Sequence, residues 1–349
     1  MSEKNKKAVI TLGEIMLRLK TPGHARLGQL NTLEATFGGS EANVAVSAAN
    51  YGLPARFITG LPENELGNAV ISDLRGFGVD TDFIVKNEHR LGIYFLETGS
   101  GPRPSKVIYD RAHASINYCT PDDFDWESIF DDAQWLHISG ITPALSENAA
   151  KLTKFAMETA SSKGIKVSCD LNYRSKLWKY GKTAPEVMNP LMEHVNVIVA
   201  NEEDIQRSLG MGLDQKIGGV ELSKDKYKRL AERVLDKYKN VEIVAISLRE
   251  SFSADHNDWS AMYYIREEEM AYFSRKYQLK NIVDRVGGGD SFAGGLVYAL
   301  CEQMESQQAL EFAVGASALK HTIPGDVNRV SKDEVFNLIV GDTSGRVQR

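Results

Sequence analysis

The stretch VDRVGGGDSF, Val283 to Phe292, places three consecutive glycines directly before an aspartate and an apolar segment. Each glycine is costly to order, because it loses more conformational freedom on folding than any other residue. Successive glycines leave their backbone N–H groups free to face one concavity, and a helix that starts here adds unpaired N–H groups. The pattern therefore predicts that Gly287, Gly288 and Gly289 form an anion site suited to a phosphate oxygen.

Asp290, which ends the glycine run, has two interpretations. As the N-cap of the helix, it would accept hydrogen bonds from the first backbone amides. As a general base, it would take the proton from a substrate hydroxyl while that oxygen attacks a phosphate held by the glycines. No GxxxxGK[ST] motif is present, and the run lies too late in the chain for a dinucleotide-binding GxGxxG motif.

The overall composition is that of an ordinary soluble globular protein, with 349 residues, 42% hydrophobic residues and a net charge of −6. No apolar run approaches the roughly 18 residues of a membrane span, and the mild acidity argues against a nucleic-acid partner. The three cysteines, Cys119, Cys169 and Cys301, contain no CxxC pair and indicate neither a zinc cluster nor a disulfide framework. We therefore expect a protein of the reducing cytoplasm.

Short β-branched segments alternate with segments of helical spacing along most of the chain. Within residues 223–239, for example, apolar residues recur every three or four positions, which is one face of a helix. This alternation predicts an α/β fold with a mostly parallel central sheet and helices on both faces. Ligands in such sheets bind beyond the carboxyl ends of the strands. The predicted strands are residues 8–13, 55–60, 135–140, 166–172, 195–201 and 241–248.

Two segments, residues 14–37 and about 90–112, interrupt this alternation. The second has the pattern of a β-hairpin whose turn is GSGPRP. Strands that cannot join the central sheet are expected to form a small sheet of their own. We therefore expect residues 1–349 to form a single domain in which this small sheet acts as a lid.

The run from Asp284 to Asp290 resembles the DTxGAGD motif of the ribokinase/PfkB carbohydrate kinase family, with Arg285 in place of threonine and Gly288 in place of alanine. Gly38, Gly39 and Asn43 resemble the sugar-side pattern of that family. Glycines allow close backbone approach, and an asparagine amide both donates to and accepts from hydroxyls. Taken alone, these three residues would equally suit a turn and a helix with Asn43 exposed.

The resemblance extends from about residue 13 to residue 330 and implies a ribokinase-like fold. The segment VANEEDI resembles the NxxE element of the family, with Asn201 matched and Asp204 in place of glutamate. The resemblance implies that these residues help to organise Mg²⁺, which prefers oxygen ligands. The alternative is a solvated acidic helix start.

Within the family, the chain is most similar to 2-keto-3-deoxygluconate kinases. An arginine fork meets the carboxylate of a sugar acid through two hydrogen bonds. Tyr109 and Arg111 are two residues apart on a strand and therefore share a face; the alternative for the tyrosines is hairpin packing. Arg174 follows a strand end and would contact the sugar or the phosphates. The residues that carry this similarity are Tyr94, Tyr109, Arg111, Arg174 and Asp326.

On the nucleotide side the resemblance is weaker. Ser247 stands where relatives have the threonine of a TxG turn, and Arg249 follows it in SLRESFSADHN, a loop without glycine. We expect both residues beside the nucleotide. Gly315 and Ala316 resemble the segment that lines the adenine in relatives, and the alternative for them is a tightly packed core helix.

The resemblance implies an ATP- and Mg²⁺-dependent sugar-acid kinase that phosphorylates the 6-hydroxyl of 2-keto-3-deoxygluconate. Asp290 would be the base, and the amides of Gly287, Gly288 and Gly289 would stabilise the moving phosphoryl group. One alternative is a fructokinase or another sugar kinase with the same core. Another is a non-catalytic sugar or nucleotide sensor, since fold does not fix function. Exposed lid strands need cover, and relatives often pair lid to lid, so we expect a homo-oligomer.

Overall fold

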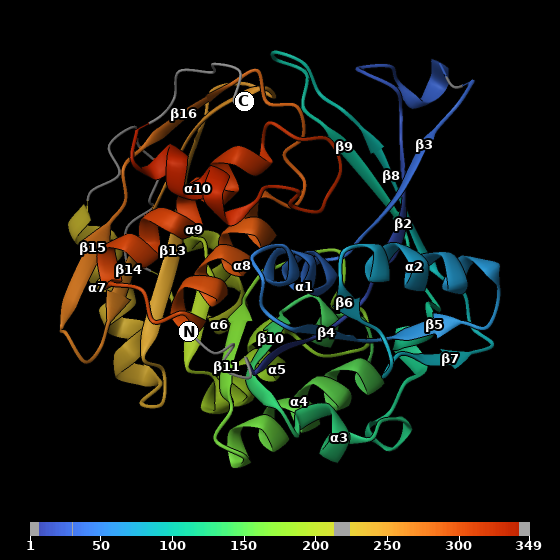
Figure 1. Ribbon diagram of the computed structural model, residues 1–349, viewed down its shortest axis with the longest axis horizontal. Helices are drawn as coiled ribbons and strands as arrows, with labels where there is room; N and C mark the ends of the chain where they lie inside the picture. The colour runs from blue at the N-terminus through green and yellow to red at the C-terminus, as the bar shows by residue number, and fades with distance from the viewer. Residues whose placement is uncertain (1–6, 30, 213–223, 342–349) are drawn as a thin grey trace.

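A large twisted sheet forms the centre of the protein (Figure 1). The structure is a computed structural model that describes residues 7–29, 31–212 and 224–341. The sheet contains β1 (Ala8–Leu12), β4 (Ala55–Ile58), β6 (Val79–Asp80), β10 (Ala133–Ser139), β11 (Lys166–Asp170), β12 (Val197–Ala200), β13 (Ile243–Ser251), β14 (His256–Ile265), β15 (Met270–Phe273) and β16 (Tyr277–Lys280). In the order β6-β4-β1-β10-β11-β12-β13, every neighbouring pair is parallel. β14 joins antiparallel to β13, and β15 and β16 both pair with β14.

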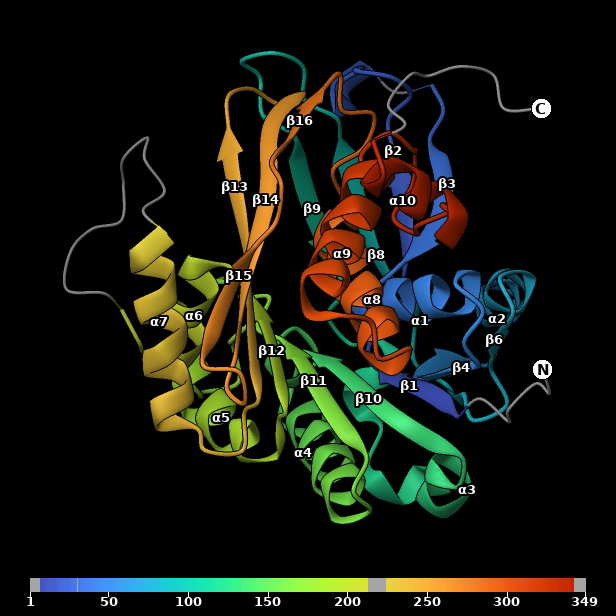
Figure 2. The same cartoon turned by 60° about the vertical axis from the view of Figure 1, so that its left-hand side comes forward.

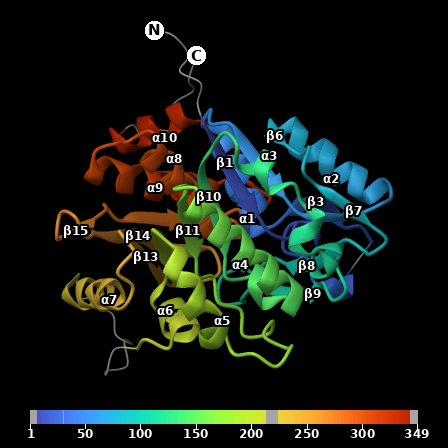
Figure 3. The same ribbon diagram turned by 90° about the horizontal axis from the view of Figure 1, so that it is seen from below.

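Helices cover both faces of this sheet (Figures 1 and 3). One face carries α1 (Ser40–Asn50), α2 (Glu65–Gly76), α8 (Gly288–Cys301), α9 (Ser306–Lys320) and α10 (Lys332–Ile339). The other carries α3 (Trp126–Phe130), α4 (Glu147–Ser162), α5 (Ala184–Leu191), α6 (Glu202–Leu209) and α7 (Lys224–Lys237). Short 3₁₀ helices lie at Leu27–Gln29, Ser115–Tyr118, Pro121–Asp123, Thr142–Ala144 and Met192–His194.

The central strands are apolar on both faces. In β1, Ile10 packs in the core on one side of the sheet and Val9 in the core on the other, and both are fully buried. Successive side chains of a strand point to opposite faces, so a strand covered by helices on both sides has a continuous apolar sequence. The ends of the strands are therefore the part of the sheet that polar ligands can reach.

A second sheet stands apart from the main body, at the upper right of Figure 1. It consists of β2 (Met16–Lys20), β3 (Glu34–Gly38), β8 (Gly92–Glu97) and β9 (Lys106–Asp110), in the order β3-β2-β8-β9. β8 and β9 form an antiparallel hairpin, whereas β2 and β8 are parallel. A further short pair joins β5 (Gly60–Pro62) to β7 (Val85–Asn87).

The predicted α/β architecture is confirmed, with a mostly parallel sheet between two helical layers. The small separate sheet is also confirmed, and its strands come from the two segments that interrupt the alternation. Its action as a lid and the single-domain interpretation of residues 1–349 stay predictions. Among the described residues, no helix has both the length and the apolar character needed to cross a membrane.

Candidate active site

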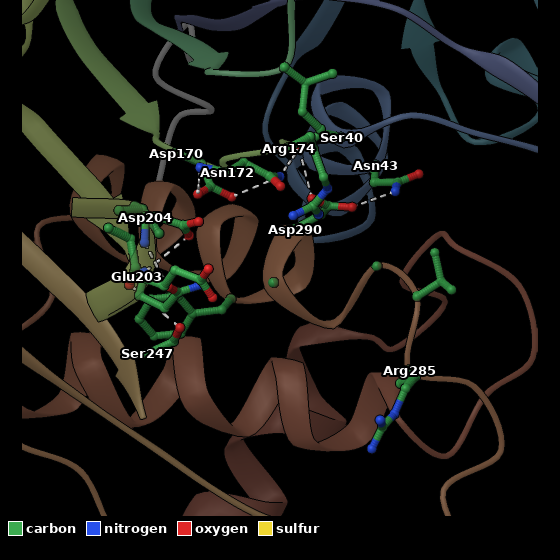
Figure 4. Close-up of a pocket in the computed structure, with 18 of the residues that line it drawn as sticks. Ser40, Asn43, Asp170, Asn172, Arg174, Glu203, Asp204, Ser247, Arg285 and Asp290 are labelled. Atoms are coloured by element: carbon green, nitrogen blue, oxygen red, sulfur yellow. Dashed lines mark hydrogen bonds between the residues drawn. The ribbon is translucent and has the colours of Figure 1, made fainter. Parts of the chain in front are cut away.

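A pocket of about 850 Å³ lies between the carboxyl ends of the parallel strands and the small sheet. Residues that follow β1, β10, β11 and β12 line its floor, and the N-terminal turns of α1 and α8 line one wall. Parallel strands place their carboxyl ends at one edge of the sheet, so residues distant in sequence meet there. Figure 4 shows part of this pocket.

The glycine run makes a sharp turn into α8. Gly287 has φ 79°, and a Cβ at this position would overlap the backbone carbonyl of Asp326. Gly288 packs against the ring of His321, whereas a Cβ on Gly289 would have no heavy atom within 4 Å. Open space therefore lies beside Gly289 in the first turn of α8, where a helix has unpaired amides for an anion. The Gly288 amide itself donates to the Arg285 carbonyl at 3.5 Å. Gly287 and Gly289 border the pocket, and Gly288 lies behind them.

Asp290 is not the N-cap of α8. The N-cap is Gly287, so the capping interpretation is wrong, and Asp290 lies in the first turn of the helix. Its carboxylate accepts hydrogen bonds from Ser40 Oγ at 2.8 Å and Asn43 Nδ2 at 2.7 Å (Figure 4). Burial raises the pKa of Asp290, and the bonds from Asn43 and Ser40 lower it. No ion pair occupies this carboxylate within the described part of the chain, so it is free to act on a ligand.

The sugar-side glycines hold α1 against the rest of the site. A Cβ on Gly38 would overlap the Asp326 carboxylate, and one on Gly39 would overlap the backbone carbonyl of Glu14. Gly39 and Asn43 line the pocket, whereas Gly38 faces Asp326 beside it. Asn43 is buried rather than exposed, so the alternative of an exposed side chain is wrong. Its amide donates to Asp290 and thereby fixes the orientation of that carboxylate.

Arg111 and Tyr109 line the same pocket, as their shared face predicts. Arg111 is buried and donates from Nε to Glu14 Oε2 at 2.8 Å, and Nη2 reaches the same oxygen. The Arg111 guanidinium lies 5.3 Å from the centre of the Tyr109 ring. Glu14 was not expected from the sequence, and its Oε1 is buried without a hydrogen-bond partner. The charge of Arg111 is therefore shared with Glu14, while Nη1 has no bond to another side chain within the described residues.

A buried ion network ties the small sheet to the glycine turn. Arg18 of β2 forms ion pairs with Asp284 and Asp326, and all three side chains are at most 4% exposed. Tyr94 of β8 donates its hydroxyl to Asp326 at 2.6 Å. Asp326 and Tyr94 were expected to contact a sugar, and both do border the pocket. Here they contact each other and Arg18, which the sequence did not single out.

Carboxylates gather at the ends of β11 and β12. Asp170 is buried, and burial followed by the charges of Asp204 and Asp290 raises its pKa well above the ordinary value. Asp204 accepts from the backbone amides of Tyr173 at 3.0 Å and Asn201 at 3.3 Å. Asn201 in turn caps α6 by accepting from the Asp204 amide at 2.9 Å. The segment is an acidic helix start, as in the alternative, but Asp204 is buried rather than solvated, and the segment borders the pocket.

These carboxylates fit a magnesium ion that arrives with a nucleotide. Among the described residues, no group of three or more His, Cys, Asp or Glu side chains could hold a metal ion by itself. Mg²⁺ often binds through one or two carboxylates, several waters and substrate phosphates. Asp170 and Asp204 repel each other in their buried position, and a cation beside them would relieve that repulsion.

Three arginines, Arg174, Arg249 and Arg285, line the pocket without an ion pair within the described part of the chain. Ser247 also borders it and donates to the Ala200 carbonyl at 3.5 Å. Gly315 and Ala316 do not border this pocket among the described residues. Gly315 packs towards α10, and Ala316 packs towards α8, so the core-helix alternative describes both residues. Their expected position beside the adenine has no support from this geometry.

Some residues of the pocket were not identified from the sequence. They are Glu14, Ser40, Asp170 and Asn172, together with Arg18 of the adjoining network. Asp284 and Arg285 were identified as members of the glycine motif but were given no role in the site. A weak signal existed for Asp170 and Asn172, because polar residues directly after a buried parallel strand lie at the ligand edge of a sheet. For Arg18 the pattern on β2 is ordinary alternation, and its partners lie 266 and 308 residues further along the chain.

The strands, the glycine turn and the pocket at the strand ends together make up a ribokinase-like α/β fold. The chain belongs to the pfkB family of carbohydrate kinases, whose pattern matches residues 6–333.

A curated relative, the 2-dehydro-3-deoxygalactonokinase of Haloferax volcanii, is 33% identical over 337 residues, which are 97% of this chain and 98% of the relative. A crystal structure of 2-dehydro-3-deoxygluconokinase from Thermotoga maritima is 48% identical with a TM-score of 0.90, and it covers 96% of this chain and 100% of that one. A putative ribokinase II from E. coli in complex with ATP and Mg²⁺ is 18% identical with a TM-score of 0.75, covering 96% and 99%. That last likeness concerns the fold alone.

Replacing Arg18 by methionine should destabilise the protein strongly, because Asp284 and Asp326 would remain buried without their cation. Loss of one partner of a buried ion pair costs about 3–5 kcal/mol. Burial already raises the pKa of Asp326, and removal of Arg18 would raise it further. A raised native pKa means that the folded state binds more protons, so the deficit should be smaller at pH 5 than at pH 8.

Chemical denaturation at both pH values measures this effect. Lys20→Met is the matched control on the same strand, since Lys20 pairs with a half-exposed Glu34 and should cost about 1 kcal/mol or less. Equal stability of the two variants would contradict a structural role for the Arg18 network.

Proposed function

We propose that this protein is a sugar-acid kinase that transfers the γ-phosphoryl group of ATP to the 6-hydroxyl of 2-keto-3-deoxygluconate. The observation that carries the proposal is Asp290: a buried carboxylate that forms no ion pair with any described residue and is held by Ser40 and Asn43 in the first turn of α8. The pocket beside it joins a sugar side, at the small sheet, to a cationic side. Relatives named for two closely related sugar-acid substrates support the choice of substrate class.

The sugar acid would lie between the small sheet and α1. Its carboxylate would meet Arg111 and Tyr109, with Arg174 as a second cation, and Gly39 and Asn43 would contact its hydroxyls. A neutral sugar would not need a buried arginine in this wall. Because Glu14 neutralises part of the charge of Arg111, Arg111 would contribute directed N–H donors to the sugar carboxylate more than net positive charge. Asp326 and Tyr94 complete this side of the pocket.

Asp290 would accept the proton of the sugar hydroxyl as that oxygen attacks the phosphorus. The amides of Gly287, Gly288 and Gly289 at the start of α8 would stabilise charge on the moving phosphoryl group. Ser247 and Arg249 would lie beside the nucleotide. Asp170, Asp204 and Asn201 would hold Mg²⁺ through its waters, and the ion would neutralise charge on the phosphates.

The small sheet would close over the sugar as a lid on a single domain and exclude water from the phosphoryl group. Its outer face has an apolar centre: β-pairing places Leu17, Leu19, Ile93, Phe95 and Ile108 on one side, with Asp110 and Lys106 at its margins. Ile108 is 53% exposed. We expect a second copy of the chain to cover this face, which makes the protein a homo-oligomer. The free cysteines suit a cytoplasmic protein.

The substrate assignment is tested by a coupled ATPase assay against a panel of sugars and sugar acids. We expect rapid ATP consumption with 2-keto-3-deoxygluconate and none above background with fructose. The rate with the galactonate-derived epimer, compared with that for 2-keto-3-deoxygluconate, decides whether the substrate matches the galactonokinase or the gluconokinase relative. Fructose turnover equal to that of the acid would instead favour a fructokinase, and no turnover with any sugar would favour a sensor.

Asp290→Asn should lose about 10²- to 10⁴-fold in turnover, the usual contribution of a general base. The amide keeps the shape of the side chain and can still bond to Ser40, so stability and ATP affinity should change little. Steady-state kinetics and calorimetric ATP titration measure the two effects. Unchanged turnover in a folded variant would exclude Asp290 as the base.

Ser40→Ala should shift the acid limb of kcat/KM to higher pH. The Ser40 bond lowers the pKa of Asp290, so its removal raises that pKa, and the base is then protonated up to a higher pH. The rate at high pH should remain close to that of the wild type. Ser47→Ala is the matched control, because Ser47 lies on the same helix and donates to the Asn43 carbonyl. If the pH profiles of Ser40→Ala and the wild type superimpose, that result would contradict the assignment of Asp290 as the base.

A further inference from the structure

Arg285 replaces the threonine of the DTxGAGD motif. It has no role in the phosphoryl transfer proposed for this protein. It lines the pocket, forms no ion pair within the described residues, and its Nε is buried without a hydrogen-bond partner. Burial and then the charge of Arg249 lower the pKa of Arg285, and Arg174 acts on Arg249 in the same way. These three arginines repel one another around one cavity, and an anionic ligand would neutralise their positive charge.

Arg285 also holds the loop between β13 and β14. Its Nη2 donates to Asn257 Oδ1 at 2.9 Å and to the Ser253 carbonyl at 3.3 Å. Figure 4 shows Arg285 directed away from Asp290, on the far side of the glycine turn. The side chain therefore joins the pocket to a loop that lacks the glycine of the usual nucleotide turn.

The tip of this loop reaches the small sheet. The Ala254 amide donates to the Gly101 carbonyl at 2.8 Å, and the Gly101 amide donates to Asp255 Oδ2 at 3.3 Å. Asp255 is held in place by Ser253 Oγ at 2.6 Å. Figure 2 shows the tips of the β13–β14 and β8–β9 hairpins side by side. We call the contact between residues 253–255 and Gly101 the clasp.

We propose that Arg285 binds the phosphates of the nucleotide and that the clasp carries this contact to the small sheet. The inference rests on the proposed use of a nucleotide by this pocket. A phosphate would fix the orientation of Arg285, which holds Ser253, and Ser253 in turn holds Asp255 against Gly101. Bound nucleotide would thus steady the hairpin that bears Tyr94 and Tyr109, before any sugar binds. Such a link is an energetic coupling between the two ligand sites.

Calorimetric titration with the Mg²⁺ complex of a non-hydrolysable ATP analogue tests the phosphate contact. Arg285→Gln should weaken binding by about 10- to 100-fold, as expected for the loss of charge-assisted hydrogen bonds. Arg229→Gln, at an exposed arginine of α7, is the matched control and should bind as the wild type does. An Arg285 variant that is folded and binds within twofold of the wild type would overturn the proposal.

Hydrogen exchange of residues 99–105 tests the clasp. In the wild type, the nucleotide analogue should slow hydrogen exchange in this turn. In Arg285→Gln, a saturating concentration of the analogue should leave the exchange rate of the turn unchanged. Asp255→Ala should keep the nucleotide affinity and lose the slowing, whereas Asp131→Ala, an exposed aspartate elsewhere, should keep both. Slowing that persists in Asp255→Ala and Arg285→Gln would refute the clasp.

Neither measurement uses a sugar or turnover. If the wild type binds the nucleotide but phosphorylates none of the sugar acids, the proposed function fails and the results for Arg285 still stand. If the wild type binds no nucleotide, both proposals fail.

Discussion

The buried pairing of Arg18 with Asp284 and Asp326 is the constraint on which the site depends. Arg18 belongs to the small sheet, Asp284 precedes the glycine turn, and the backbone of Asp326 packs against Gly287. One guanidinium therefore fixes three segments relative to one another. Such a buried pair gains little net stability over apolar packing, so its value lies in the position that it imposes. The proposed sugar side and the proposed phosphate side of the pocket meet at this point.

The pocket has two electrostatic halves around Asp290. On one side, Asp170 and Asp204 lie close enough for burial and mutual repulsion to raise the pKa of Asp170. On the other, burial and then the charge of Arg174 lower the pKa of Arg249, and burial and then the charge of Arg249 lower the pKa of Arg285. Compensation within the protein is partial: the charge of Arg174 lowers the pKa of Asp170, and the charge of Asp255 raises the pKa of Arg285. A metal–polyphosphate complex brings a cation to the carboxylates and anions to the arginines, which is why the arrangement suits a nucleotide better than a neutral ligand.

Much of the fold and the central motif could be predicted from the sequence, because both are encoded locally. The alternation of strands and helices and the pattern of the β8–β9 hairpin depend on neighbouring residues, and the glycine run before Asp290 marks a turn by itself. Errors arose where a role depends on a distant partner. Asp290 has the sequence context of an N-cap, yet its carboxylate bonds to Ser40 and Asn43, about 250 residues earlier. Gly315 packs towards α10, and its expected place beside the adenine stays a prediction.

The sequence alone determined the class of fold, because the alternation of strands and helices is encoded locally. It also indicated the family, because the run from Asp284 to Asp290 resembles a motif of that family. Only the tertiary structure decided which charges are compensated. Arg111 is paired with Glu14, and Arg18 with two aspartates, whereas Arg285 is left with an unsatisfied nitrogen. The physical reason is that the state of a charge depends on the groups within a few ångströms of it. For Arg18 those groups come from the opposite end of the chain.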